Sequence, residues 1–123
     1  MAHRILLVED DDESCEALRA VLLSRGYEVT CAEDGVEALR ILWRGPRPSV
    51  ILLDVMLPRL DGFMFREYQR ANAPWADIPV IVTSALDERA TYNLDAAAWF
   101  RKPLDLDALI AAVARTADPE RAP

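Results

Sequence analysis

Several residue types that carry common chemistries are scarce in this chain of 123 residues. It has one histidine, His3, and two cysteines, Cys15 and Cys31. A lone histidine beside the terminus is a poor candidate for catalysis, and the two cysteines lack the paired spacing of a metal site. Because we expect a cytoplasmic protein, we predict two buried thiols rather than a disulfide.

Positive charge and long apolar runs are scarce as well. The chain has 14 Lys and Arg residues against 21 Asp and Glu residues, a net charge of −7. That balance argues against direct nucleic-acid binding, although not against a DNA-binding partner. No apolar run approaches the length of a membrane span, and the first residues do not resemble a signal peptide. We therefore expect a cytoplasmic protein without membrane association.

The chain does have a regular alternation of apolar runs and helical patterns, within a composition that is 52% hydrophobic. Strands are predicted at 4–8, 27–31, 50–53, 79–83 and 96–100, each followed by a helix; 4–8 and 50–53 are of the buried type, and 27–31 alternates. This order predicts one α/β domain with a doubly wound, five-stranded parallel sheet covered on both faces. We expect an ordered core over 4–115 and a frayed tail over 116–123.

Some positions are predicted within those helices. Asp12 is expected to be the N-cap of the first helix, and Gly26 to end it. Phe63 is expected in the core beneath the third helix. The last helix should begin after Asp105 and bury an apolar face made of Leu106, Leu109, Ile110 and Val113.

An aspartate marks the end of the central strand. Asp54 follows four consecutive apolar residues, and a loop with Pro58 and Asp61-Gly62 comes next. The carboxyl ends of strands in an open parallel sheet face the crevice where such folds place their chemistry. Asp54 is therefore the first candidate for a functional residue.

Five consecutive acids, Glu9 to Glu13, follow the first strand. The helix dipole stabilises acidic side chains in the first turn of a helix, which accounts for Asp12 and Glu13. Glu9 and Asp10 lie at the strand end, where their repulsion calls for a counter-charge such as Mg²⁺. The local sequence leaves the helix-start and metal-site interpretations about equal.

Two further strand ends carry polar groups. Ser84 follows the fourth strand, where a hydroxyl is commonly a cap or turn residue but could also donate to a bound anion. Lys102 follows the fifth strand; such a lysine is usually a solvated surface charge. Here Pro103 fixes the chain direction after it, and the peptide bond between them is a candidate for the cis form.

The combination is more specific than any member. Glu9-Asp10, Asp54 with its Asp-x-x-x-Pro-x-x-Asp-Gly loop, Ser84-Ala85 and Lys102-Pro103 together resemble the receiver domain of two-component response regulators, most closely receivers of winged-helix transcription regulators. The resemblance extends from Arg4 to about Arg115. It implies a flavodoxin-like three-layer sandwich with strand order 2-1-3-4-5.

The resemblance also implies roles. Asp54 would be the phosphoacceptor, and Glu9, Asp10, Asp54 and the backbone carbonyl of Met56 would hold Mg²⁺, with Mn²⁺ as an alternative ion. Lys102 would contact the phosphoryl group and Ser84 would be the switch hydroxyl. The donor would be a phosphohistidine on a sensor histidine kinase or phosphotransfer protein. Beyond Mg²⁺-dependent self-phosphorylation from a phosphodonor and slow self-dephosphorylation, no enzyme activity is implied.

The chain departs from the family pattern between Ser84 and Lys102, which are closer in sequence than is usual by about one helical turn. We therefore predict a short or irregular fourth helix. The signalling surface of the fourth helix, fifth strand and fifth helix, and a homodimer formed through it, become uncertain. The aromatic switch position holds Trp99, which could rotate or could be a fixed core residue.

Three other interpretations were weighed. A pseudo-receiver would keep the fold as an interaction domain without using phosphate. A flavodoxin-like electron carrier would need a phosphate-binding loop after the first strand, where this chain has five acids. An aspartyl phosphatase would need a second acid two residues after its nucleophile, where this chain has Met56. The phosphoacceptor interpretation is therefore preferred, with the pseudo-receiver as its alternative.

Overall fold

The computed structural model describes residues 3–86 and 94–118. Its five strands form one parallel sheet in the order β2-β1-β3-β4-β5, as predicted. The strands are β1 (Arg4–Val8), β2 (Glu28–Ala32), β3 (Val50–Asp54), β4 (Val80–Ser84) and β5 (Ala98–Arg101). The helices are α1 (Asp12–Ser24), α2 (Gly35–Arg44), α3 (Gly62–Arg70) and α5 (Leu106–Ala117). No helix in the described part of the chain is long and apolar enough to cross a membrane.

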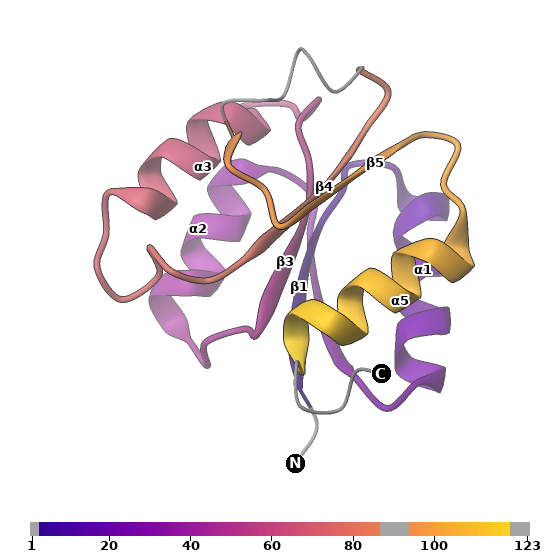
Figure 1. The fold of residues 1–123 in the computed structure, drawn as a ribbon. Helices are drawn as coiled ribbons and strands as arrows, with labels where there is room; N and C mark the ends of the chain where they lie inside the picture. The colour runs from indigo at the N-terminus through magenta and orange to yellow at the C-terminus, as the bar shows by residue number, and fades with distance from the viewer. Residues whose placement is uncertain (1–2, 87–93, 119–123) are drawn as a thin grey trace.

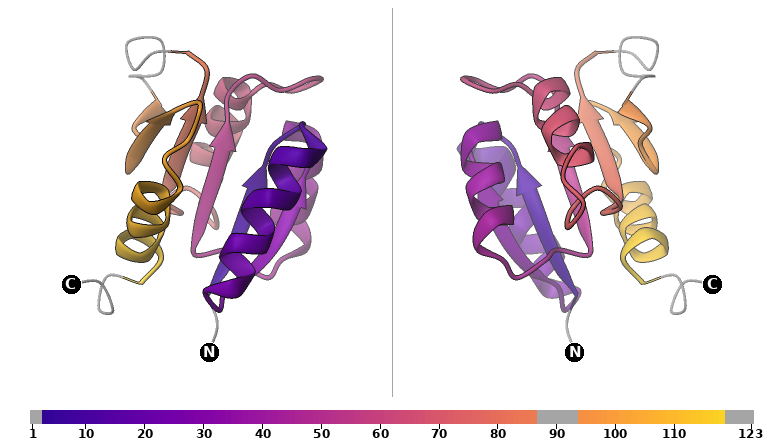
Figure 2. Two further views of the ribbon diagram at one scale, coloured as in Figure 1. Left: turned by 90° about the vertical axis from the view of Figure 1, so that its right-hand side faces the viewer. Right: turned by 90° about the vertical axis from the view of Figure 1, so that its left-hand side faces the viewer.

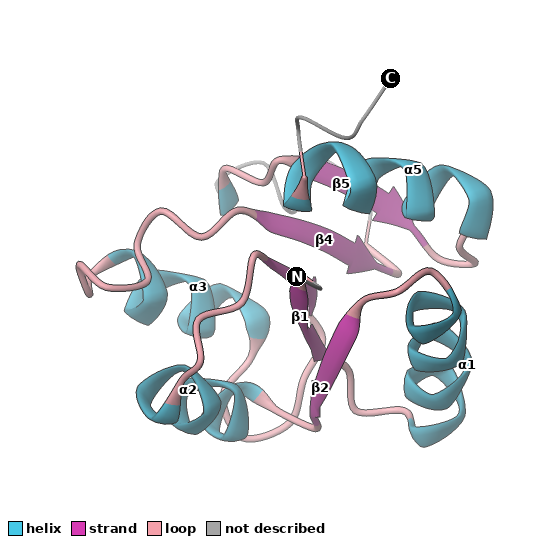
Figure 3. Cartoon of the chain, turned by 90° about the horizontal axis from the view of Figure 1, so that it is seen from below, coloured by secondary structure: helices cyan, strands magenta, loops and turns pink. Residues whose placement is uncertain are grey.

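The helices cover both faces of the sheet. Helices α1 and α5 lie on one face, and α2 and α3 lie on the other (Figures 1 and 2). The view along the sheet from below separates the same two pairs (Figure 3). This is the three-layer sandwich that the sequence predicts.

Alternation along the central strands builds two cores. Ile5 and Leu7 of β1 pack with the α1 and α5 side, whereas Leu6 and Val8 pack with the α2 and α3 side. All five residues of β3 are buried, and so are all five of β4. Continuous apolar runs are typical of parallel strands covered on both faces, which is why the sequence identified them.

Several local predictions need correction. The N-cap of α1 is Asp11, not Asp12, because the Asp11 carboxylate accepts a hydrogen bond from the Ser14 amide at 3.0 Å. Phe65, rather than Phe63, is the fully buried aromatic of α3, and Phe63 is only partly buried. Leu106 is 41% exposed because it begins α5 before the buried stripe is reached.

The remaining predictions concern chain ends and connections. Helix α5 includes Thr116 and Ala117, which were assigned to the tail, and residues 119–123 lie outside the described part of the chain. The Lys102-Pro103 peptide bond is cis, as the sequence suggested. Cys15 and Cys31 are free thiols, as predicted, but only Cys15 is buried and Cys31 is partly exposed. The predicted fourth helix falls largely on residues 87–93, outside the described residues.

Candidate functional site

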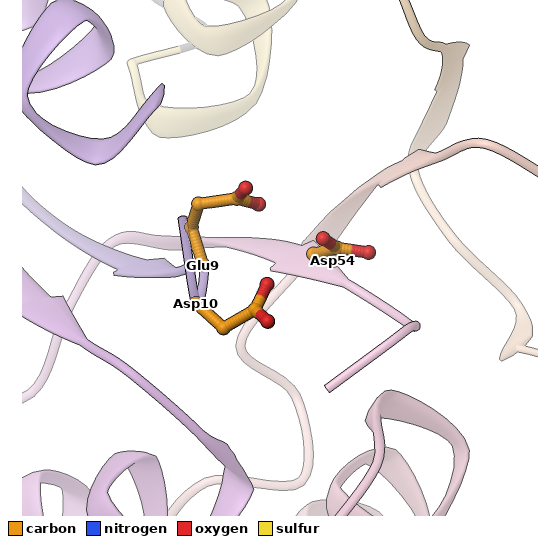
Figure 4. A group of neighbouring side chains, drawn as sticks. All are labelled: Glu9, Asp10 and Asp54. Atoms are coloured by element: carbon orange, nitrogen blue, oxygen red, sulfur yellow. The ribbon is translucent and has the colours of Figure 1, made fainter. Parts of the chain in front are cut away.

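An acidic cluster lies at the carboxyl edge of the sheet. Glu9 and Asp10 directly follow β1, and Asp54 ends the adjacent strand β3. One carboxylate oxygen from each of the three lies within 4.8 Å of the others. Figure 4 shows the three side chains extending into a shared space. Parallel pairing, with Val8 opposite Leu53, brings together acids that are 44 positions apart in the chain (54 − 10).

Lys102 completes this cluster from the loop after β5. Its Nζ donates to both Glu9 carboxylate oxygens, at 3.1 and 3.0 Å, and to Asp54 Oδ2 at 3.0 Å. Its backbone N–H donates to the Ser84 carbonyl at 2.8 Å, which fixes the loop beside β4. Lys102 is therefore a site residue and not a solvated surface charge.

The charges of this cluster change proton affinities. Burial, together with the neighbouring Asp54 carboxylate, raises the pKa of Glu9 to about 7, although Lys102 acts in the opposite direction. Burial alone would lower the pKa of Lys102, but its hydrogen bonds to Asp54 and Glu9 outweigh burial and raise it. One ammonium group does not balance three carboxylates, so the cluster favours a further cation.

The donor set fits a hard divalent cation. All three side chains offer carboxylate oxygens, the ligands that Mg²⁺ prefers, and Asp10 is exposed so that a hydrated ion can enter. Glu9 and Asp54 are each only 4% exposed. The Met56 amide donates to Asp54 Oδ1 at 2.9 Å, which orients the carboxylate and starts the loop. The Met56 carbonyl as a ligand stays a prediction.

Ser84 and Trp99 lie on the neighbouring strands. Ser84 ends β4, is fully buried, and its Oγ accepts a hydrogen bond from the Leu86 amide at 2.9 Å. Trp99 is partly buried on β5, opposite Val82, and packs against the core on the α2 and α3 side. Its buried indole N–H has no hydrogen-bond partner among the described residues. Neither side chain contacts the acids or the Lys102 ammonium in the described contacts.

The loop between β3 and α3 is held by contacts that the sequence analysis missed. The Arg59 guanidinium donates through Nε to the buried Asp34 carboxylate at 2.7 Å, and Asp34 also caps α2 through the Glu37 amide. Burial alone would raise the pKa of Asp34, but these hydrogen bonds lower it. Arg59 has a φ of 61°, a left-handed conformation in which the chain turns back toward α2.

Two glycines allow the close approach of that loop. The Gly35 amide donates to the Leu60 carbonyl at 3.1 Å, and a Cβ on Gly35 would lie 2.3 Å from that oxygen. The Gly62 amide donates to the Val55 carbonyl at 3.1 Å, and a Cβ there would lie 2.5 Å from Val55 Cα. The Asp-Gly pairs at 34–35 and 61–62 were the sequence signal for these contacts.

Fold and site together define a doubly wound α/β domain with a cluster of three acids and a lysine at the carboxyl edge of its sheet. The family model for the response regulator receiver domain matches residues 5–114. The chain therefore belongs to the response regulator receiver domain family, and its place is in two-component signalling.

Individual relatives agree. The chain is 42% identical over 130 residues to the response regulator MprA of Mycobacterium tuberculosis, a match that covers 99% of this chain and 55% of that protein. The MprA of Mycobacterium sp. is 40% identical over 131 residues, covering 100% of this chain and 55% of that protein. The chain thus spans about half the length of the curated relatives it matches.

Solved structures share the fold. The signal receiver domain of a signal transduction histidine kinase from Syntrophus aciditrophicus has a TM-score of 0.88 at 29% identity, covering 98% of this chain and 93% of that one. The chemotaxis response regulator CheY4 of Vibrio cholerae has a TM-score of 0.85 at 26% identity, covering 94% of this chain and 99% of that one. These similarities confirm the predicted family and fold class.

Proposed function

We propose that the chain is a phosphoacceptor module, which takes a phosphoryl group onto Asp54 from a phosphohistidine of a sensor histidine kinase or phosphotransfer protein. The observation that supports it best is the pair of contacts on the Asp54 carboxylate. Lys102 Nζ lies 3.0 Å from Oδ2, and the Met56 amide lies 2.9 Å from Oδ1. A nucleophilic carboxylate is thus oriented on both oxygens beside a positive charge.

The chemistry follows from charge. An ionised Asp54 oxygen would attack phosphorus, forming an O–P bond while the P–N bond to the donor imidazole breaks. Two anions approaching each other repel, and Lys102 reduces that repulsion at the attacked group. Mg²⁺, or alternatively Mn²⁺, held by Glu9, Asp10, Asp54 and the Met56 carbonyl, would supply the remaining neutralisation.

The conformational change after phosphorylation would begin at Ser84. A phosphoryl group adds roughly −1.5 to −2 charges at neutral pH, which favours a hydroxyl donor close to it. The Ser84 hydroxyl could satisfy it by turning from the Leu86 amide, its present partner at 2.9 Å. Trp99, whose indole N–H lacks a partner among the described residues, would then gain room to rotate. The surface around β5 and α5 would change with it and signal to a downstream protein, a second copy or an output domain.

The direct test is intact-protein mass after treatment with acetyl phosphate, with and without Mg²⁺. We expect the gain of one phosphoryl group, dependent on Mg²⁺, in the parent chain and in an Asp107→Asn control that removes an exposed acid on α5. Asp54→Asn should gain none. Equal labelling of Asp54→Asn would disprove the phosphoacceptor assignment.

The pseudo-receiver alternative predicts a different result. A chain that uses the fold only for interaction should neither gain phosphate nor bind beryllofluoride, a phosphoryl mimic, in the presence of Mg²⁺. Failure of the parent chain in both assays would therefore reject the phosphoacceptor function and leave the interaction domain.

A further inference from the structure

The two cysteines lie side by side although they are 16 positions apart. Cys15 is in the first turns of α1 and Cys31 is in β2, and their Sγ atoms are 2.6 Å apart. Cys15 belongs to the core between the sheet and the α1–α5 layer, and Cys31 packs against that core. Two sulfurs whose side chains already point at one another need little backbone movement to reach the bond length of about 2.0 Å.

The surrounding elements hold this pair in place. Helix α1 is joined to strand β2 by a tight turn, in which the Tyr27 amide donates a hydrogen bond to the Leu22 carbonyl at 3.2 Å. Cys15 and Cys31 face each other at the opposite end of this unit, near the start of α1 and the end of β2. There the Glu9 amide also donates to the Ala32 carbonyl at 3.0 Å, so the pair lies beside the start of the acidic cluster.

The two thiols differ in access. Cys15 is on the buried face of α1, whereas Cys31 is half-buried on β2, one of the two edge strands of the sheet. Burial and the adjacent Cys31 sulfur raise the pKa of the Cys15 thiol to about 12, which disfavours Cys15 as the first nucleophile. Cys31 is therefore the sulfur that a solvent-borne oxidant reaches first.

We propose that Cys15 and Cys31 form a reversible redox pair that closes into an intrachain disulfide joining α1 to β2. With a peroxide as oxidant, the Cys31 sulfur attacks one peroxide oxygen and becomes a sulfenic acid, releasing one water. The Cys15 sulfur then attacks the Cys31 sulfur; the S–O bond breaks, and the hydroxyl leaves as water with the Cys15 proton. Overall two thiols and one hydrogen peroxide give one disulfide and two waters, and a thiol reductant reverses the change.

The test uses the folded chain, first reduced and then treated with one equivalent of hydrogen peroxide below its unfolding transition. We expect loss of both free thiols, an intact mass lower by two hydrogens, and recovery with dithiothreitol. Tryptic cleavage at Arg19 and Arg25 separates the two cysteines, so peptides 5–19 and 26–40 should remain linked only without reductant. The oxidised chain should have the higher thermal midpoint, since the bond restricts the unfolded chain.

Single variants provide the controls. Cys15→Ala should leave Cys31 as a sulfenic acid that dimedone traps, and Cys31→Ala, a change at the more exposed position, should leave Cys15 largely unmodified. Neither variant should shift its midpoint on oxidation. The proposal is overturned if both parent thiols persist, or if the parent gives only a trapped Cys31 adduct or an intermolecular dimer.

Discussion

Glu9 is the residue whose protonation links pH to the acidic cluster. Its pKa of about 7 in the folded chain exceeds the ordinary 4.5, so between these values the folded chain binds more protons than the unfolded chain. The free energy of unfolding of the metal-free chain should therefore fall as pH rises through that window, by at most roughly 3 kcal/mol, and be fully retained below it. Denaturant titrations at several pH values measure this slope.

The same proton should compete with a divalent cation. Mg²⁺ needs the ionised carboxylate, so its affinity should weaken roughly tenfold between pH 8 and pH 6, with release of a proton on binding. Calorimetric titration in buffers of different ionisation enthalpy measures both. Glu9→Gln serves as the comparison, since it should bind Mg²⁺ more weakly and lose the pH dependence. An affinity that is flat over this range would contradict the assignment of Glu9.

Lys102 should contribute to the stability of the metal-free chain as well as to phosphoryl transfer. Lys102→Met keeps the side-chain length but leaves Glu9 and Asp54 without their shared ammonium partner. We expect a loss of roughly 1–3 kcal/mol in the free energy of unfolding, reduced because Lys102 is 29% exposed. Added Mg²⁺ should recover part of it. Arg101→Met, at the exposed neighbouring position, is the matched control and should change stability little.

The residues of the cluster could be predicted because each follows a strand, and parallel strands place those ends at one edge of the sheet. The N-cap could not: Asp11 and Asp12 are chemically equal in sequence, and only backbone geometry selects Asp11. The contact between Cys15 and Cys31 depends on the rotation of α1 about its axis, which hydrophobic spacing determines too coarsely.

At the scale of elements, the loop from β3 to α3 is the part that positions the site. Gly62→Ala should displace it, because the new Cβ would lie 2.5 Å from Val55 Cα and 2.9 Å from the Asp54 carbonyl oxygen. Both neighbours are backbone atoms next to Asp54 and Met56, so the strain falls on the cluster itself. We expect a loss of roughly 1–3 kcal/mol in stability together with weaker Mg²⁺ binding.

Gly26→Ala separates these two effects. Gly26 has a φ of 90° and open space where a Cβ would stand, so alanine there should cost about 1 kcal/mol through backbone conformation alone. Its Mg²⁺ affinity, measured by calorimetry beside that of Gly62→Ala, should equal that of the parent. Equal affinities in all three chains would mean that the loop does not position the cluster.

Helix α3 shows which features of an element the sequence could not predict. Arg66 and Gln69 are buried, contrary to their usual exposure. The Arg66 guanidinium donates to the Leu94 and Asp95 carbonyls at 2.8 and 3.0 Å. Gln69 donates to the Trp75 and Ile78 carbonyls. The carbonyl partners of Arg66 are 28 and 29 positions away, and those of Gln69 are 6 and 9 positions away. Neither set follows a regular helical spacing, so only the folded arrangement identifies them.

At the scale of the whole molecule, the two halves of the sheet carry different residues of the site. The β1 and β3 ends hold the acids, whereas β4 and β5 carry Ser84, Trp99 and the strand that leads to Lys102.

If the two halves of the sheet differ in this way, a ligand bound at the site should change amide exchange mainly in the half that contains β4 and β5. Beryllofluoride with Mg²⁺ should change amide exchange in β4, β5 and the start of α5, because Ser84 and Lys102 connect the cluster to those elements. Exchange in α2 should change little, since its described backbone contact outside the helix is with the Leu60 carbonyl of the loop after β3 and not with the acids. Asp54→Asn, treated identically, should show neither change. Uniform protection over the whole sheet would instead indicate simple stabilisation by a bound ligand, without a directed response.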